Sequence, residues 1–146
     1  HLESNLAGIS LAELRAAQAA ELVGSLPAGV PVVVMGDLND EPGSLMYQVL
    51  TGAGLTDVWR ELRPGVSGTT CCHDDNLGDM PARFDEHIDY IFERGFGTGR
   101  GGLQGRIARF GDQPSERTAG PLHPLWASDH AGLTATLNQL PAPAGD

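Results

Sequence analysis

The chain has 146 residues, 40% of them hydrophobic and 19% charged, which suits one globular domain and excludes an intrinsically disordered segment. Its formal net charge is −10, which argues against tight nonspecific binding to the phosphate backbone of DNA. No apolar stretch approaches the roughly 20 residues that span a bilayer. Because the chain begins at His1 without a methionine, we expect any targeting segment to be missing, and the compartment stays open between secreted and cytoplasmic.

Hydrophobic periodicity and turn residues predict alternating helices and strands. The expected helices cover residues 11–26 and 44–53, and the expected strands cover residues 30–35, 88–92, 106–110 and 133–137. Ser10 and Glu13 have the spacing of a capping box for the first helix, and Ser44 is a candidate cap for the second. The continuous apolar run of residues 30–35 is typical of a strand buried on both faces.

The rest of the chain is richer in turn residues. We predict a loop over residues 63–83, with one short strand at residues 68–72, and further loops over residues 95–105 and 112–125. We expect one domain over residues 1–140 and a disordered, proline-rich tail over residues 141–146.

Polar side chains follow the first predicted strand at Asp37 and Asn39. Because side chains alternate along an extended chain, these two point the same way and Leu38 points back. The carboxylate can hold or deprotonate a water molecule, and the carboxamide can position that water or a phosphoryl oxygen without adding charge. The competing interpretation is an Asx turn that merely closes a tight loop.

Two further segments carry side chains that could act together with Asp37 and Asn39. Asp129 could bind a hard cation, and His130 could stabilise negative charge that develops on a phosphoryl oxygen. Asp89 lies in an apolar strand and needs a partner; an Asp89–His130 pair would orient the ring and favour its cation. The alternatives are a simple cap at residues 129–130 and a structural salt bridge between Asp89 and an arginine. Together the three segments indicate a metal-assisted phosphoester hydrolase.

Other candidates carry weaker signals. Cys71 and Cys72 are sequence neighbours, which rarely bridge each other, and with His73 and Asp74 they lack the paired spacing of a structural zinc site. His123 is expected to be exposed, and the glycines of residues 97–105 match no phosphate-binding motif. Surface arginines such as Arg83 and Arg100 are weak phosphate candidates, and Trp59 and Trp126 are expected to pack rather than stack on bases.

Four short motifs in this order resemble those of the endonuclease/exonuclease/phosphatase superfamily, to which pancreatic-type deoxyribonucleases, abasic-site endonucleases, inositol polyphosphate 5-phosphatases and bacterial sphingomyelinases belong. They are His1-Leu2-Glu3, Gly36-Asp37-Leu38-Asn39, Ile88-Asp89-Tyr90-Ile91 and Ser128-Asp129-His130. The likeness covers nearly the whole chain. One departure is His87, which stands where the family usually has arginine.

The resemblance implies a role for each matching residue. Asp37 would activate the attacking water and Asn39 would position it or the phosphate, while Asp89 would orient His130 against the phosphate. His1 would be a second histidine on the phosphate side and a possible acid toward the leaving oxygen. Asp129 would be a metal ligand together with Asp37 and Asn39, and the metal would be magnesium, or else manganese or calcium.

The resemblance also implies an α+β fold that forms half of a four-layer α/β/β/α sandwich, with one mainly antiparallel or mixed sheet flanked by helices. The family's first half, with its metal-binding glutamate, is absent, so the chain alone should expose a large apolar face and lack activity. We expect the partners to be a phosphoester substrate, whether nucleic acid, phospholipid or sugar phosphate, and the missing N-terminal half. The alternative function is a non-catalytic interaction module or an inactive fragment.

Overall fold

The computed structural model describes residues 1–7, 9–96, 102–119 and 124–138. The helices are α1 (Ala12–Ser25), α2 (Leu45–Gly52), α3 (Val58–Leu62) and the 3₁₀ turn η1 (Pro114–Glu116). The strands are β1 (Val32–Asp37), β2 (Thr56–Asp57), β3 (Asp89–Arg94), β4 (Gln104–Phe110) and β5 (Gly132–Asn138). The expected tail over residues 141–146 lies outside the described residues. No helix among the described residues is long and apolar enough to cross a membrane.

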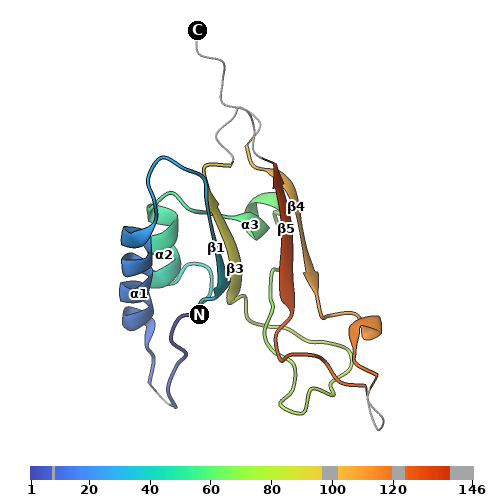
Figure 1. Ribbon diagram of the computed structural model, residues 1–146. Helices are drawn as coiled ribbons and strands as arrows, with labels where there is room; N and C mark the ends of the chain where they lie inside the picture. Colours follow the sequence, from blue (N-terminus) through green and yellow to red (C-terminus); the bar gives the residue numbers. More distant parts are fainter. Residues whose placement is uncertain (8, 97–101, 120–123, 139–146) are drawn as a thin grey trace.

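The strands pair antiparallel throughout, which confirms the predicted α+β class. They divide into two sheets, in the orders β1-β3-β2 and β4-β5, where the sequence predicts one. Figure 1 shows α1 and α2 on one side of β1 and β3, and the β4-β5 pair on the other side. The physical reason is that Leu133, Ala135 and Leu137 pack with Ile91 face to face, instead of extending the sheet through its edge.

The helix caps follow the sequence only in part. Ser44 caps α2, because its side chain accepts a hydrogen bond from the Tyr47 backbone nitrogen at 3.3 Å. The capping box at Ser10 is wrong, since the N-cap of α1 is Leu11 and no side chain caps it. Ser10 keeps one long contact, because its Oγ accepts from the Ala12 backbone nitrogen at 3.4 Å, while the Leu11 backbone nitrogen donates to the side chain of Asn5 at 3.0 Å.

Residues 56–88 differ most from the prediction. The sequence does not predict β2 or α3. Asp57 caps α3, because its side chain accepts hydrogen bonds from the Trp59 and Arg60 backbone nitrogens. The short strand expected at residues 68–72 is wrong: Cys71 makes only isolated bridges, to Glu86 and to His130. A short helix capped by aspartate carries too little periodicity to be recognised, and a single bridge carries none.

The core lies on both faces of β3. Tyr90 and Phe92 are buried against α1 and α2, whereas Ile91 faces the β4-β5 pair and α3. On this second face Val33 is 37% exposed and Met35 is 68% exposed. The prediction that residues 30–35 are buried on both faces is therefore wrong, because β4-β5 covers only part of the sheet. The apolar face that the sequence analysis expected is present at these two side chains.

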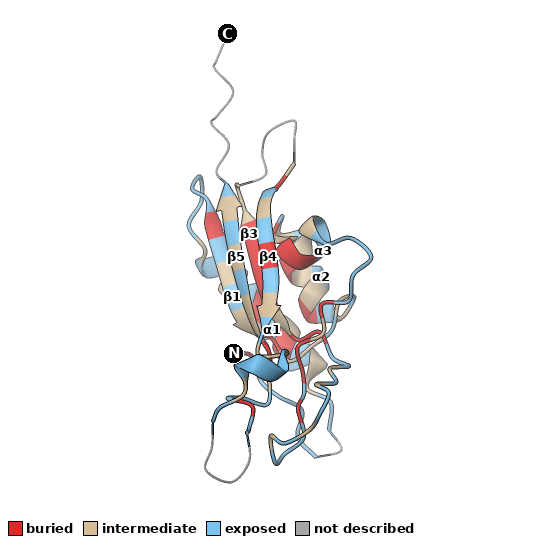
Figure 2. Cartoon of the chain, turned by 90° about the vertical axis from the view of Figure 1, so that its right-hand side faces the viewer, coloured by how far each residue is buried: buried red, intermediate tan, exposed pale blue. Residues whose placement is uncertain are grey.

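The outer face of the β4-β5 pair is mostly polar, apart from Phe110, which is 50% exposed. Figure 2 looks onto this face and shows exposed positions alternating with more buried ones along both strands. Arg106, Thr134 and Thr136 point outward and are exposed, while Ile107 points inward and is buried. The pair therefore buries one face against β3 and leaves the other to solvent.

Candidate functional site

The candidate site lies at one end of the central sheet. Asp37, the last residue of β1, is directly opposite Asp89, the first residue of β3, in the antiparallel register. Opposite residues of an antiparallel pair project their side chains from the same face, with Cβ atoms about 5 Å apart. This register alone brings two of the predicted catalytic carboxylates to one edge, on the face that looks toward β5.

Asp37 and Asn39 contact each other as the alternation predicts, with Leu38 buried behind them. One carboxylate oxygen of Asp37 accepts from the Asn39 backbone nitrogen at 2.8 Å, so the Asx turn is present. Asn39 has a φ of 53°, a left-handed conformation that asparagine tolerates. The second oxygen of Asp37 accepts from Asn39 Nδ2 at 3.2 Å. The turn and the functional interpretation are thus compatible.

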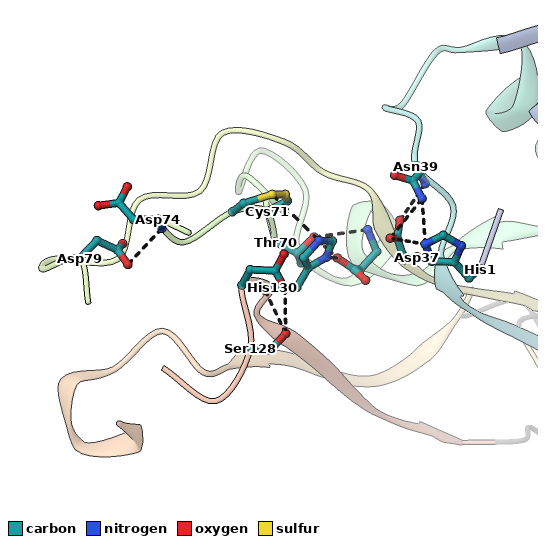
Figure 3. The surroundings of a disulfide bond; sticks show 12 residues. His1, Asp37, Asn39, Thr70, Cys71, Asp74, Asp79, Ser128 and His130 are labelled. Atoms are coloured by element: carbon teal, nitrogen blue, oxygen red, sulfur yellow. Dashed lines mark hydrogen bonds and ion pairs between the residues drawn. A yellow bond between two sulfur atoms is a disulfide. The ribbon is translucent and has the colours of Figure 1, made fainter. Parts of the chain in front are cut away.

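His1 completes this half of the site. Its Nε2 lies 3.3 Å from Asp37 Oδ2 and 3.2 Å from Asn39 Nδ2, as Figure 3 shows. A single ring nitrogen cannot donate to the carboxylate and accept from the amide at once, so protonation of the ring selects its partner. The segment is held in place because the Leu2 backbone nitrogen donates to the Asp37 carbonyl oxygen at 3.0 Å. The His1 side chain is 67% exposed and accessible to a substrate.

Asp89 and His130 form the other half. His130 Nδ1 lies 2.8 Å from Asp89 Oδ2, which is the pair that the sequence predicts, and among the described residues no arginine pairs with Asp89. Thr70 donates its hydroxyl to the same carboxylate oxygen at 2.6 Å and accepts from the Asp89 backbone nitrogen at 3.3 Å. Sequence reasoning missed Thr70, which is fully buried; a threonine in an irregular loop gives no signal of such a contact.

The loop before β5 holds His130 in place. Its backbone nitrogen donates to the Ser128 hydroxyl at 3.1 Å, and the neighbouring Ala131 nitrogen donates to the Thr70 carbonyl oxygen at 2.8 Å. A cavity of about 340 Å³ opens beside the Asp89–His130 pair and is lined also by Phe110, Gly111, Glu116, Ala127, Ser128, Ala131 and Gly132. The pair is therefore accessible from this side, which is a requirement for contact with a substrate.

The charges of the site shift two pKa values. Burial raises the pKa of Asp37, and the negative charge of Asp89 adds to this, against the lowering effects of the Asn39 hydrogen bond and of His130. Burial by itself would lower the pKa of His130, but the hydrogen bond and charge of Asp89 outweigh it, so that the pKa is raised above its ordinary value. Asp37 and Asp129 contribute to the same rise. The site thus favours an imidazolium beside carboxylates.

The predicted metal ligands are Asp37, Asn39 and Asp129. Asp37 and Asn39 are in contact, and Asp129 is exposed, with its carboxylate accepting a hydrogen bond from the Ser128 hydroxyl. In the described part of the chain, the one group of three His, Cys, Asp or Glu side chains with ligand atoms within 4.8 Å is Cys71, Cys72 and His130. Magnesium takes about six oxygen ligands, of which several are usually water. Among the described residues, Asp37 and Asn39 offer adjacent oxygen donors for such an ion.

Of the weaker candidates in the described residues, the two cysteines reach the site. Cys71 and Cys72 form a disulfide, although sequence neighbours rarely bridge each other, and Cys72 Sγ lies 4.0 Å from His130 Nε2. His73 is not grouped with them: it stacks on Trp126 and contacts Asp79 at 3.1 Å. Trp59 and Trp126 are buried packing residues, as predicted. Arg83 is exposed, and Arg100 and His123 lie outside the described residues.

The sheet end thus brings together paired carboxylates, a carboxamide and an oriented histidine on an α+β scaffold. A sequence profile of the endonuclease/exonuclease/phosphatase family matches residues 3–130. The chain belongs to this family, whose members are hydrolase-like proteins acting on phosphoesters and generally depend on a metal ion. A search of curated proteins found no match.

Three solved structures share the fold. The endonuclease/exonuclease/phosphatase of Beutenbergia cavernae is 22% identical, with a TM-score of 0.65 over 99% of this chain and 36% of its own. A family protein of Bacteroides thetaiotaomicron is 20% identical, with a TM-score of 0.52 over 88% of this chain and 43% of its own. SmcL is 16% identical, with a TM-score of 0.54 over 94% and 51%. The chain thus spans between about a third and a half of these structures.

Proposed function

We propose that this chain carries the water-activating and phosphate-binding part of a metal-dependent phosphoester hydrolase. The observation that supports this most is the register of β1 against β3, which sets Asp37 opposite Asp89, while Asp89 holds His130 at 2.8 Å. Family membership supports the general reaction class. The substrate, and the choice between a diester and a monoester, stay open, because loops rather than the scaffold determine them.

Each residue has a role that its contacts suit. Asp37, whose pKa burial raises, is a stronger base than an exposed aspartate and would accept the proton of the attacking water. Asn39 would hold that water or a phosphoryl oxygen. His130 uses Nδ1 for Asp89, and its Nε2, whose contact in the structure is Cys72 Sγ at 4.0 Å, would donate to a phosphoryl oxygen as negative charge develops there. His1, exposed beside Asp37, would protonate the leaving oxygen.

The metal is part of the proposal. Magnesium, or else manganese or calcium, would neutralise charge on the phosphate, and oxygen donors such as Asp37, Asn39 and Asp129 would supply part of its ligand set. We propose that water, the substrate phosphate and ligands from outside the chain complete the set. The chain alone would then bind the ion weakly and turn over little substrate.

The second candidate is a non-catalytic interaction module. The chain spans between 36% and 51% of the length of the three similar structures, which leaves this possibility open for the chain alone. Titration calorimetry with magnesium separates the two in a joined protein, in which the chain is fused to the N-terminal half of a family domain. Tight one-to-one binding supports the enzyme, and absent or millimolar binding supports the module.

The hydrolysis of bis-p-nitrophenyl phosphate with magnesium tests the proposed function in the same joined protein. Removal of a general base costs typically about 10²- to 10⁴-fold in rate, so we expect a loss of this size in Asp37→Asn. Asp75→Asn is the matched control, because it removes the same charge from an exposed loop position and should retain the rate within about twofold. Equal rates in the two variants would contradict the role of Asp37.

A further inference from the structure

The Cys71–Cys72 disulfide lies beside the histidine of the candidate site and has no part in the proposed chemistry (Figure 3). Cys72 Sγ is 4.0 Å from His130 Nε2, and Cys71 forms an antiparallel bridge with His130. In the described part of the chain, these are the three His, Cys, Asp or Glu side chains whose ligand atoms all lie within 4.8 Å of one another. Two sulfur donors and one nitrogen donor are therefore gathered at one point.

Backbone hydrogen bonds hold the two segments that carry these donors against each other. The His73 nitrogen donates to the Asp129 carbonyl oxygen at 2.7 Å, and the Ala131 nitrogen donates to the Thr70 carbonyl oxygen at 2.8 Å. The two bonds flank the cysteines on one segment and His130 on the other. Breaking the disulfide should cost little stability, because a link between sequence neighbours closes almost no loop in the unfolded chain. The folded backbone therefore keeps the three donors together in the reduced chain.

The ring of His130 is oriented as a metal-binding histidine is. Its Nδ1 contacts Asp89 Oδ2 at 2.8 Å, and a histidine that binds a metal through one nitrogen usually donates the proton of the other to such a carboxylate. Nε2 is the nitrogen that faces Cys72. With the ring proton on Nδ1, Nε2 carries the lone pair that a cation needs.

Sulfur and imidazole donors select a soft cation. Thiolates and imidazole suit zinc, whereas magnesium takes oxygen ligands. A tetrahedral zinc ion, with ligand bonds of about 2.0–2.3 Å, spaces its ligand atoms roughly 3.3–3.8 Å apart. The 4.0 Å between Cys72 Sγ and His130 Nε2 is close to this spacing. The three donors therefore suit a zinc ion whose fourth ligand is water.

We propose that the reduced chain binds a zinc ion through Cys71 Sγ, Cys72 Sγ and His130 Nε2. Cys72 is exposed, so a reductant can reach the disulfide. A phosphine gives two electrons to the sulfur–sulfur bond, which breaks, while water supplies the oxygen of the phosphine oxide and the two protons of the new thiols. Zinc then displaces the two thiol protons, which pass to the solvent.

The consequence for the reaction rests on the proposed function. There His130 Nε2 donates to a phosphoryl oxygen, and a nitrogen that binds zinc cannot do so. Zinc should therefore inhibit hydrolysis when the cysteines are reduced. In the oxidised chain the sulfur atoms are bonded to each other, and the site does not form.

A cadmium titration of the 146-residue chain tests the site without any turnover. Cadmium replaces zinc at thiolate sites, and its thiolate complexes absorb in the ultraviolet. After reduction and removal of the phosphine, the absorption should rise up to one equivalent of cadmium, and the oxidised chain should show no such rise. Cys72→Ser, a change at an exposed side chain, should weaken binding at least about tenfold. No absorption in the reduced chain, or equal absorption in both forms, would overturn the proposal.

The nitrogen ligand is identified by comparing two histidines. His73 follows the cysteines in sequence, but its ring nitrogens contact Asp79 and the Gly111 carbonyl oxygen, each at 3.1 Å. His130→Gln should weaken cadmium binding at least about tenfold, whereas His73→Gln should leave it unchanged. Because His73 is buried, the ¹⁵N shifts of the rings in the unsubstituted chain give a second readout. Cadmium should move the Nε2 signal of His130 and not the signals of His73, and the reverse pattern would overturn the proposal.

The joined protein tests the consequence for hydrolysis. One equivalent of zinc should slow the hydrolysis of bis-p-nitrophenyl phosphate at least about tenfold in the reduced protein, because the reaction loses a donor to the phosphoryl oxygen. The same zinc should change the rate of the oxidised protein, and of reduced Cys72→Ser, by less than about twofold. Equal slowing of the oxidised and reduced proteins, or zinc binding without slowing, would overturn the inhibitory role. An inactive joined protein whose reduced chain still binds cadmium would contradict the proposed function alone and support the metal site.

Discussion

The two faces of the central sheet differ in how completely they are covered. On the face toward α1 and α2, Tyr90, Phe92 and Leu50 are at most 2% exposed and form one closed core. On the face toward β4 and β5, Met35 is 68% exposed and lies beside an apolar groove of about 430 Å³. The candidate site lies at the end of this second, open face, because Asp37 and Asp89 project from it.

The two faces of the sheet therefore have different roles. The closed face fixes the strands and therefore the register that sets Asp37 against Asp89. The open face leaves room beside the same strand ends, where a substrate and further protein ligands can approach. The stability of the chain should then depend on one face, and its chemistry on the other.

The largest effect on stability is expected on the closed face. Leu50→Ala should lower the free energy of unfolding by about 2–5 kcal/mol, because it removes a fully buried side chain and leaves a cavity. Met35→Ala, the matched change on the open face, should lower it by less than about 1 kcal/mol, since that side chain is mostly in water. Urea denaturation measures both, and similar losses would remove the distinction between the faces.

A smaller effect is expected for Thr70, which holds the Asp89 carboxylate from behind. Thr70→Val keeps the shape but leaves a carboxylate oxygen without its hydroxyl donor, and should cost about 1–3 kcal/mol in unfolding free energy. Thr134→Val, on the exposed outer face of β5, should cost almost nothing. If the two variants unfold alike, Thr70 does not support the site.

The Asp89–His130 pair gives a dependence on pH. Because the pKa of His130 is raised in the folded chain, its pairing stabilises the fold below the ordinary imidazole value, and this contribution is lost as the pH rises through the folded pKa. Asp89→Asn should lower the pKa of His130, as NMR titration of the ring measures. A pKa unchanged by this variant would mean that the contact does not control the charge of the ring.

The smallest effect concerns the loop next to the site, where Asp79 pairs with His73. Burial by itself would raise the pKa of Asp79, but the His73 hydrogen bond and charge lower it. Its contribution to stability is therefore present above the ordinary aspartate value and lost as the pH falls through the lowered one. Asp79→Asn should lose less stability than the wild type on acidification below about pH 4, as thermal unfolding at several pH values shows. A steeper loss in the variant would contradict this sign.

Most of the site could be predicted from the sequence, because the functional side chains lie at the ends of strands. The alternation around Leu38 predicts that Asp37 and Asn39 share a face, and the cost of burying Asp89 predicts its pairing with His130; both contacts are present. Thr70 and α3 were missed, because their contacts come from tertiary packing and leave no periodic pattern. The division into two sheets was missed for the same reason, since alternation does not reveal which strands pair.

The central claim is that Asp89 acts on the phosphate mainly through His130. A double-mutant cycle of Asp89→Asn and His130→Gln, with kcat/KM for a phosphodiester in the joined protein with magnesium, tests it most directly. If Asp89 acts through His130, the double variant should lose hardly more activity than His130→Gln alone. A loss equal to the product of the two single losses would contradict it.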